Sequence, residues 1–110
     1  MSSFQISQEK VARMVGNIQG MVHYTARTTQ MYFEGKATMG QIALCKAWCT
    51  LRGREVVALA RELCGGNGIV LEHGVMKHFI DMEAIYTYEG TYDINALVAA
   101  RDLTGKSAFK

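Results

Sequence analysis

One carboxylate in this sequence lies in surroundings that could make it a general base. Glu89 stands between a tyrosine and a glycine within residues 86–94, which read YTYEGTYDI. The Thr91 hydroxyl can cap a new helix by accepting a hydrogen bond from a free N–H of its first turn. Asp93 would lie in that turn, where the helix dipole favours negative charge. We expect the nearby aromatic rings to screen the carboxylate partly from water, which would make it a usable base at neutral pH.

A glutamate before a capped helix is also a common surface feature, and a second motif is needed to decide between the two interpretations. Residues 64–69 read CGGNGI. This segment resembles the Leu-Gly-Gly-Asn-Gly motif of the acyl-CoA dehydrogenase and acyl-CoA oxidase flavoproteins. In that family the motif is followed by Tyr-Glu-Gly-Thr, which carries the catalytic glutamate. Residues 88–91 match those four residues here, in the same order and at the same spacing.

The resemblance extends from Phe4 to Lys110 and implies an all-α fold, the antiparallel helical bundle of the family's C-terminal domain. Residues 83–95 are most similar to the plant peroxisomal short-chain acyl-CoA oxidases, and next to the glutaryl-CoA dehydrogenases. We therefore expect residues 1–110 to be a single C-terminal domain, with the family's N-terminal and middle domains absent from this sequence.

By this resemblance, Glu89 is the catalytic base of an FAD-dependent oxidoreductase that acts on acyl-CoA in fatty acid β-oxidation. The family's glutamate removes the pro-R proton from the α-carbon of the thioester. A hydride leaves the β-carbon for the flavin N5, which gives a trans-2-enoyl-CoA. The backbone N–H of the same glutamate holds the thioester oxygen. Gly90 matches the family's substrate-contacting glycine, and Tyr88 is predicted to contact the substrate beside it.

The resemblance also assigns residues to FAD. One group lies at the helix start after the base, where free N–H groups can bind the pyrophosphate. A second group matches the segment that meets the FAD of the partner subunit, and a third matches a pair that reaches the adenine part across the dimer. A homo-oligomer, either dimer or tetramer, is therefore implied. The three groups are Thr91, Tyr92 and Asp93; Glu62, Leu63, Cys64, Gly65 and Gly66; and Phe4 and Gln5.

Composition suits a packed helical domain. The 110 residues contain no proline and are 49% hydrophobic, which favours helices over a turn-rich sandwich. A formal charge of +2 is too small to imply a nucleic acid or an acidic membrane as partner. No apolar run approaches the ~20 residues of a membrane span. Three cysteines without a disulfide-like framework indicate a reducing compartment. The resemblance implies the peroxisome, with the mitochondrial matrix as the alternative.

Hydrophobic spacing predicts a first helix that starts at Ser7 and ends near residues 34–36, where Gly35 can adopt the left-handed conformation of a helix cap. Its apolar residues recur at the spacing of one buried face. These are Val11, Met14, Val15, Ile18, Met21 and Val22, followed by Thr25 and Ala26.

Three more helices are expected. The second begins with a capping box at residues 38–41 and ends at residues 65–66, and Gly53 within it suggests close approach of a neighbouring helix. The third covers roughly residues 72–80, and residues 82–88 are expected to form a link. The last starts at Thr91 and ends before Gly105.

Two further patterns are not predicted to bind ligands. Cys45 and Cys49 are four residues apart and could share a metal, but no other ligands occur at the usual spacing, so we expect buried thiols and no metal site. Residues 105–107 imitate the end of a phosphate-binding P-loop. The earlier glycine is replaced by Ala100, and a helix precedes the segment instead of a strand.

A second interpretation is non-enzymatic. The chain could be a truncated, catalytically inactive helical module that associates with other subunits, or a fragment of a glutaryl-CoA dehydrogenase. In the family, the absent domains supply most of the flavin site and much of the CoA channel. We therefore expect the 110 residues alone to be inactive. Acyl chain length, and the distinction between oxidase and dehydrogenase, depend on residues mostly outside this chain.

Overall fold

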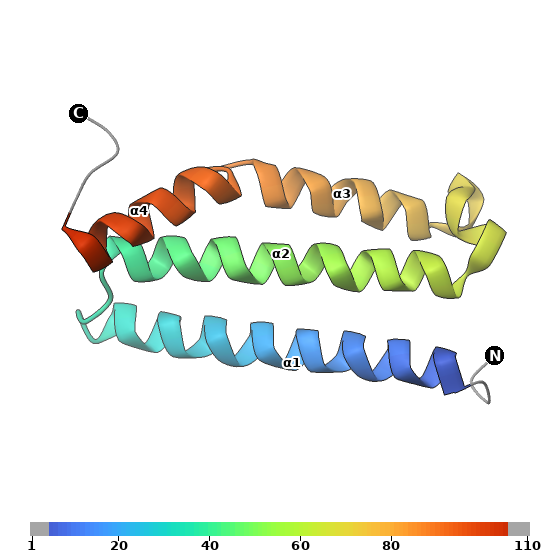
Figure 1. The fold of residues 1–110 in the computed structure, drawn as a ribbon, viewed down its shortest axis with the longest axis horizontal. Helices are drawn as coiled ribbons and strands as arrows, with labels where there is room; N and C mark the ends of the chain where they lie inside the picture. The colour runs from blue at the N-terminus through green and yellow to red at the C-terminus, as the bar shows by residue number, and fades with distance from the viewer. Residues whose placement is uncertain (1–4, 106–110) are drawn as a thin grey trace.

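The long helix α2, Met39–Leu63, is the centre of the structure, a computed structural model that describes residues 5–105. Helix α1, Gln5–Phe33, runs antiparallel along one side of α2 (Figure 1). On the other side, α3, Val75–Thr87, and α4, Tyr92–Thr104, follow one another along its length. The bundle measures 49 × 26 × 22 Å, and residues 5–105 contain no strand. The all-α antiparallel bundle predicted from the sequence is confirmed.

Small residues on α2 let its three neighbours approach closely. Most of the buried residues of the described chain belong to this helix, and several are glycine, alanine or cysteine. A methyl group added at Gly53 would lie 2.8 Å from Cε of Met82 on α3, so the close approach expected at this glycine is confirmed. The buried residues of α2 are Gly40, Ala43, Cys45, Ala47, Thr50, Gly53 and Leu59.

The predicted helix ends are confirmed where capping residues mark them. Gly35 follows α1 with φ of 72°, and Gly105 follows α4 with the same φ. At the start of α2, Gln41 N–H donates to the Thr38 hydroxyl at 3.1 Å, and Thr38 N–H donates to the Gln41 side chain at 2.9 Å. At the start of α4, Ile94 N–H donates to the Thr91 hydroxyl at 3.3 Å. Side-chain capping therefore locates both helix starts from sequence alone.

The predicted bounds of the third helix were wrong. Two short 3-10 turns, Gly65–Ile69 and Leu71–His73, follow α2, and α3 begins only at Val75, after Gly74 with φ of 77°. The helix then continues through the segment expected to be a link and ends at Thr87. The β-branched and aromatic residues 85–87 have modest helix propensity, but packing against α2 overrides it. The link between α3 and α4 is residues 88–91 alone.

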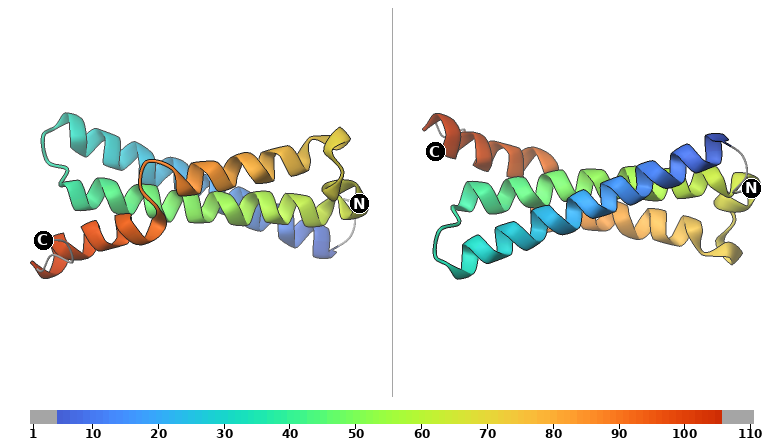
Figure 2. Two further views of the ribbon diagram at one scale, coloured as in Figure 1. Left: turned by 90° about the horizontal axis from the view of Figure 1, so that it is seen from above. Right: turned by 90° about the horizontal axis from the view of Figure 1, so that it is seen from below.

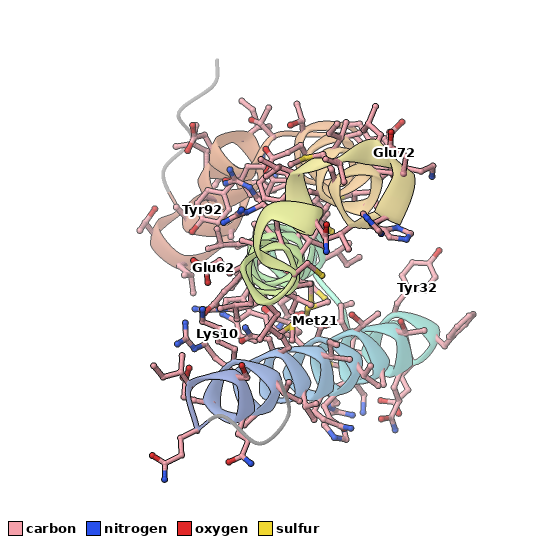
Figure 3. The ribbon with its side chains drawn as sticks, turned by 90° about the vertical axis from the view of Figure 1, so that its right-hand side faces the viewer. Lys10, Met21, Tyr32, Glu62, Glu72 and Tyr92 are labelled. Carbon is pink, nitrogen blue, oxygen red and sulfur yellow. The ribbon has the colours of Figure 1, made fainter. Side chains whose placement is uncertain are left out.

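The first helix differs from its prediction in two ways. It already includes Gln5, before the expected start at Ser7. Helix α1 crosses α2 obliquely (Figure 2), and its apolar residues do not form one buried face, because no residue of α1 is fully buried. Met14 is half-buried, and Met21 points from α1 toward α2 (Figure 3). The branched residues of the set remain exposed: Val11 by 47%, Val15 by 51%, Ile18 by 43% and Val22 by 57%.

None of the helices in residues 5–105 combines the length and the apolar character needed to cross a membrane.

Candidate functional site

The candidate base lies on a four-residue elbow, residues 88–91, where the chain turns from α3 into α4. Glu89 has φ of 56°, and it is the one residue other than glycine with positive φ in the described chain. Gly90 follows with φ of 104°. Left-handed backbone costs a residue with a side chain about 1–3 kcal/mol, and such positions cluster at functional sites. The strained position therefore supports the assignment of function to Glu89.

The expected screening of Glu89 by aromatic rings is not found. Glu89 is exposed, and Tyr88 is 57% exposed. The other two rings of the segment, Tyr86 and Tyr92, stack on each other instead, with centroids 6.0 Å apart and planes 18° apart. This stacking packs the end of α3 against the start of α4. Within this domain the carboxylate is open to solvent, so a surface that shields it must come from a bound ligand or another part of a larger protein.

The half-buried Lys46 of α2 binds the backbone of the elbow. Its ammonium donates to the carbonyl of Tyr86 at 3.0 Å and to the carbonyl of Gly90 at 2.6 Å. Asn95 of α4 donates from Nδ2 to the same Gly90 carbonyl at 3.0 Å. Burial lowers the pKa of Lys46, and the nearby negative charge of Glu89 acts in the opposite direction. The elbow is thus held by side chains from α2 and α4.

Arg54 of α2 binds the last two turns of α3. Its Nε donates to Glu83 at 2.7 Å, and its guanidinium lies 4.3 Å from the centroid of the Tyr86 ring. The hydrogen bond to Glu83 is the main cause that raises the pKa of Arg54. Glu83, the nearest other carboxylate before the elbow, is therefore already paired with a cation, which makes it a poorer candidate for a base than Glu89.

The start of α4 fits a bound phosphate through its backbone. The first hydrogen bond from the helix runs from Asn95 N–H to the carbonyl of Thr91 at 3.0 Å, and Ile94 N–H is capped by the Thr91 hydroxyl. The N–H groups of Tyr92 and Asp93 precede these bonds and remain available to an anion. The exposed Asp93 carboxylate opposes a phosphate by charge. The predicted FAD contacts of these residues are thus feasible through N–H groups.

The other predicted FAD residues lie at the far end of α3 from the elbow. Helix α3 has 13 residues and is therefore about 20 Å long. The glycine turn that follows α2 is at one end of it, and Glu89 is at the other (Figure 1). One flavin ring cannot contact both groups within a single chain. This separation agrees with the expectation that the glycine segment meets the cofactor of a partner subunit.

At that far end, the residues differ in their suitability for a ligand. Glu62 is exposed but already lies 3.5 Å from the ammonium of Lys10, and the two side chains point toward each other (Figure 3). Gly65, with φ of 59°, and Gly66 have open space where a side chain would begin. Leu63 and Cys64 are half-buried, Gln5 is exposed at the start of α1, and Phe4 lies outside the described residues.

The two cysteines of α2 lie in the interface with α1. Cys45 is buried, and its Sγ is 3.9 Å from that of Cys49. The Cys49 thiol lies 3.6 Å from the hydroxyl of Thr25, and burial raises the pKa of this thiol. No group of three or more metal-ligating side chains occurs within residues 5–105. The contacts support packing as the role of both cysteines.

Sequence reasoning missed Lys46, Arg54 and Asn95 as residues that shape the site. Lys46 gave one usable signal, because it lies next to Ala47 and one turn after Ala43, both buried residues of α2. A lysine at such a position needs acceptors for its ammonium. Nothing in the sequence pointed to the carbonyls of residues 86 and 90 as those acceptors.

The chain is similar to a known protein family and to solved structures. A family model described as "Acyl-CoA dehydrogenase, C-terminal domain" matches residues 1–104. A crystal structure of glutaryl-CoA dehydrogenase from Mycobacterium smegmatis matches with a TM-score of 0.91 and 29% identity, over 99% of this chain. A glutaryl-CoA dehydrogenase from the same organism in complex with FADH2 matches with a TM-score of 0.90 and 30% identity, again over 99%. The chain spans 28% of the length of each of these two proteins. It belongs to the acyl-CoA dehydrogenase family, whose C-terminal domain it contains.

Proposed function

We propose that this domain supplies the general base of an FAD-dependent enzyme that removes hydrogen from the α- and β-carbons of an acyl-CoA thioester. The single observation that carries the proposal is the backbone of Glu89, held in the left-handed region at an anchored elbow and open toward solvent. The family supports the same chemistry, and one similar structure is a complex with FADH2.

In this mechanism the Glu89 carboxylate takes the proton from the α-carbon. When bound, FAD supplies the acceptor for the hydride of the β-carbon. The N–H of Glu89 makes no hydrogen bond to the described backbone and is available to the thioester carbonyl, where it would stabilise developing negative charge. Gly90 leaves room beside this N–H, because it carries no side chain. Tyr88, exposed on the same elbow, is positioned to border the acyl group.

The finer assignment is a short-chain acyl-CoA oxidase of the peroxisome, working in fatty acid β-oxidation as a homo-oligomer. The residues around Glu89 support it. The alternative is a glutaryl-CoA dehydrogenase, and the similarity to two structures of that enzyme favours this alternative. Comparing a short straight-chain acyl-CoA with glutaryl-CoA as reductant, and oxygen with an artificial electron acceptor as oxidant, separates the two.

The decisive test of the base is Glu89→Gln in the flavin-loaded enzyme. Glutamine keeps the size of the side chain but removes its basic oxygen, while the backbone N–H is unchanged. The thioester should therefore still bind. We expect flavin reduction, followed as bleaching after anaerobic mixing with acyl-CoA, to slow by about 10²–10⁴-fold.

Two matched variants complete this test. Glu72→Gln removes an exposed carboxylate from the turn before α3 and should leave the bleaching rate unchanged. Glu83→Gln removes the other carboxylate near the elbow. If Glu89→Gln bleaches within a few-fold of the parent rate, Glu89 is not the base and the proposal is wrong. Abolished bleaching in Glu83→Gln would then assign the role to Glu83.

A further inference from the structure

The elbow that carries Glu89 is strained at that residue, whereas the positive φ of the next residue is one that glycine adopts freely. Glu89 has φ of 56° and Gly90 has φ of 104°. Because an L residue rarely adopts such a φ, neighbouring contacts must over-determine the conformation for it to persist. The link itself, residues 88–91, has only one backbone hydrogen bond back to α3, from Tyr88 N–H to the carbonyl of Ala84 at 2.9 Å. The remaining restraint comes from side chains.

Lys46 contacts the chain on both sides of Glu89. Its two acceptors, the carbonyls of Tyr86 and Gly90, lie three residues before and one residue after the carboxylate. Tyr86 is in the last turn of α3, where carbonyls have no partner in their own helix and where the helix dipole favours a cation. The Lys46 ammonium therefore caps the end of α3 and also binds the Gly90 carbonyl. In this way it sets the distance between the end of α3 and that carbonyl.

Asn95 completes the arrangement from the other side. Its Nδ2 donates to the Gly90 carbonyl at 3.0 Å, so this carbonyl accepts from both α2 and α4. A side chain at Gly90 would begin 3.1 Å from the Asn95 amide, so the two residues are closely packed. Lys46 belongs to α2, which packs against the other three helices, so its hydrogen bonds connect the elbow to the central helix of the domain.

We propose that Lys46 is a positioning residue for the general base: it fixes the backbone of residues 86–90 and thereby the direction of the Glu89 carboxylate and N–H. The inference rests on the proposed function of Glu89. Lys46 would touch neither substrate nor flavin. It would act on the reaction through its two hydrogen bonds to backbone carbonyls. In this role the Lys46 ammonium acts only as a hydrogen-bond donor to the backbone and takes no part in the chemical step.

The test compares Lys46→Met with Lys46→Arg in the flavin-loaded enzyme. Methionine keeps an unbranched chain of similar length but donates no hydrogen bond. Arginine keeps charge and donors. A reacting group displaced by an ångström can slow a reaction by about 10²-fold. We therefore expect Lys46→Met to slow flavin reduction by about that factor, mainly in kcat and with KM within a few-fold, and Lys46→Arg to recover most of the loss.

Hydrogen exchange of the same proteins supplies a readout that does not depend on activity. Lys46→Met should speed amide exchange in residues 86–95 by about tenfold or more, and leave α1 unchanged. Helical circular dichroism checks that the variant is folded. Lys77→Met is the matched control, since Lys77 is an exposed lysine paired with Asp81 at 2.9 Å on α3. It should change neither reduction nor exchange at the elbow.

The outcomes separate the two proposals. If Glu89→Gln reduces its flavin normally, the proposed base is wrong, and the exchange data alone decide whether Lys46 holds the elbow. If Glu89→Gln is slow while Lys46→Met reduces within about twofold of the parent, the base stands and the role of Lys46 is overturned. Unchanged exchange at residues 86–95 in Lys46→Met, or an equal loss in Lys77→Met, overturns it as well.

Discussion

At the scale of single residues, the site depends on side chains that hold backbone more than on side chains that would meet a ligand. Glu89 and Gly90 have positive φ angles. Lys46 and Asn95 both donate hydrogen bonds to the Gly90 carbonyl. Arg54 neutralises Glu83 and covers the ring of Tyr86. The result is an exposed Glu89 carboxylate on a turn whose backbone is bound by side chains of α2 and α4.

The cysteines give a residue-scale prediction about metal. A thiol must lose its proton to ligate zinc, and burial raises the pKa of Cys49, which opposes that loss. We expect purified protein to contain no stoichiometric zinc by elemental analysis, and a chelator to leave its helical circular dichroism unchanged. About one zinc per chain, lost together with helicity, would overturn the role of Cys45 and Cys49 in packing.

At the scale of elements, helix caps decide where the chain turns, and one cap joins distant helices. The carboxylate of Asp102, near the end of α4, accepts a hydrogen bond from Gly40 N–H in the first turn of α2 at 2.8 Å. A side chain at Gly40 would collide with that carboxylate. Together with the Thr38 capping box, this contact satisfies the start of α2 and secures the far end of α4 against it. The Asp102 carboxylate and the positive end of α2 attract each other.

The Thr91 cap gives a prediction at this scale. Thr91→Ala leaves the N–H of Ile94 without its acceptor and should cost about 1 kcal/mol of folding free energy. It should also weaken FAD binding, since α4 would begin less regularly, while flavin reduction by Glu89 continues in the loaded enzyme. Urea denaturation and FAD titration measure the two effects.

The control for this prediction is Thr29→Ala, an exposed threonine within α1. Because alanine favours helix and no cap is lost, this change should alter stability by less than about 0.5 kcal/mol. If Thr91→Ala behaves like Thr29→Ala, the hydroxyl contributes nothing as a cap.

At the scale of the whole molecule, the domain leaves functional surfaces uncovered. The carboxylate of Glu89 is exposed, and so is the stripe Val11, Val15, Ile18 and Val22 on α1. An exposed apolar stripe of this kind is typical of a surface that meets another protein surface. The predicted FAD residues at the start of α4 and those at the glycine turn after α2 lie near opposite ends of α3, a helix about 20 Å long. A complete flavin site is therefore expected to need more than one copy of this domain, as well as other parts of a larger protein.

The corresponding prediction concerns FAD and residues 1–110 expressed alone. The chain spans 28% of the two glutaryl-CoA dehydrogenases it matches, so it is expected to hold only a minority of the flavin contacts. We expect a helical protein by circular dichroism that elutes from gel filtration without FAD. A yellow fraction that retains stoichiometric FAD would show that this domain binds the cofactor by itself.

Local chemistry in the sequence determined several features that the structure confirms. The capping box at residues 38–41, the Thr91 cap and the left-handed Gly35 act through neighbours in the chain, so spacing suffices to predict them. The two motifs at residues 64–69 and 88–91 were sufficient to predict the family and the all-α fold, which are confirmed. Glu89 as base stays a prediction.

Only the tertiary structure decided which groups meet. The contacts of Lys46 with residues 86 and 90, and of Asp102 with Gly40, join positions 40 to 62 residues apart, and no local pattern encodes such a pairing. Packing on α2 extended α3 through a segment of modest helix propensity. The spacing of the valines on α1 predicted a buried face, but these valines are exposed in the bundle, where α1 crosses α2 obliquely. Helical periodicity shows that a face is apolar, but the surface that covers it is set by how the helices cross.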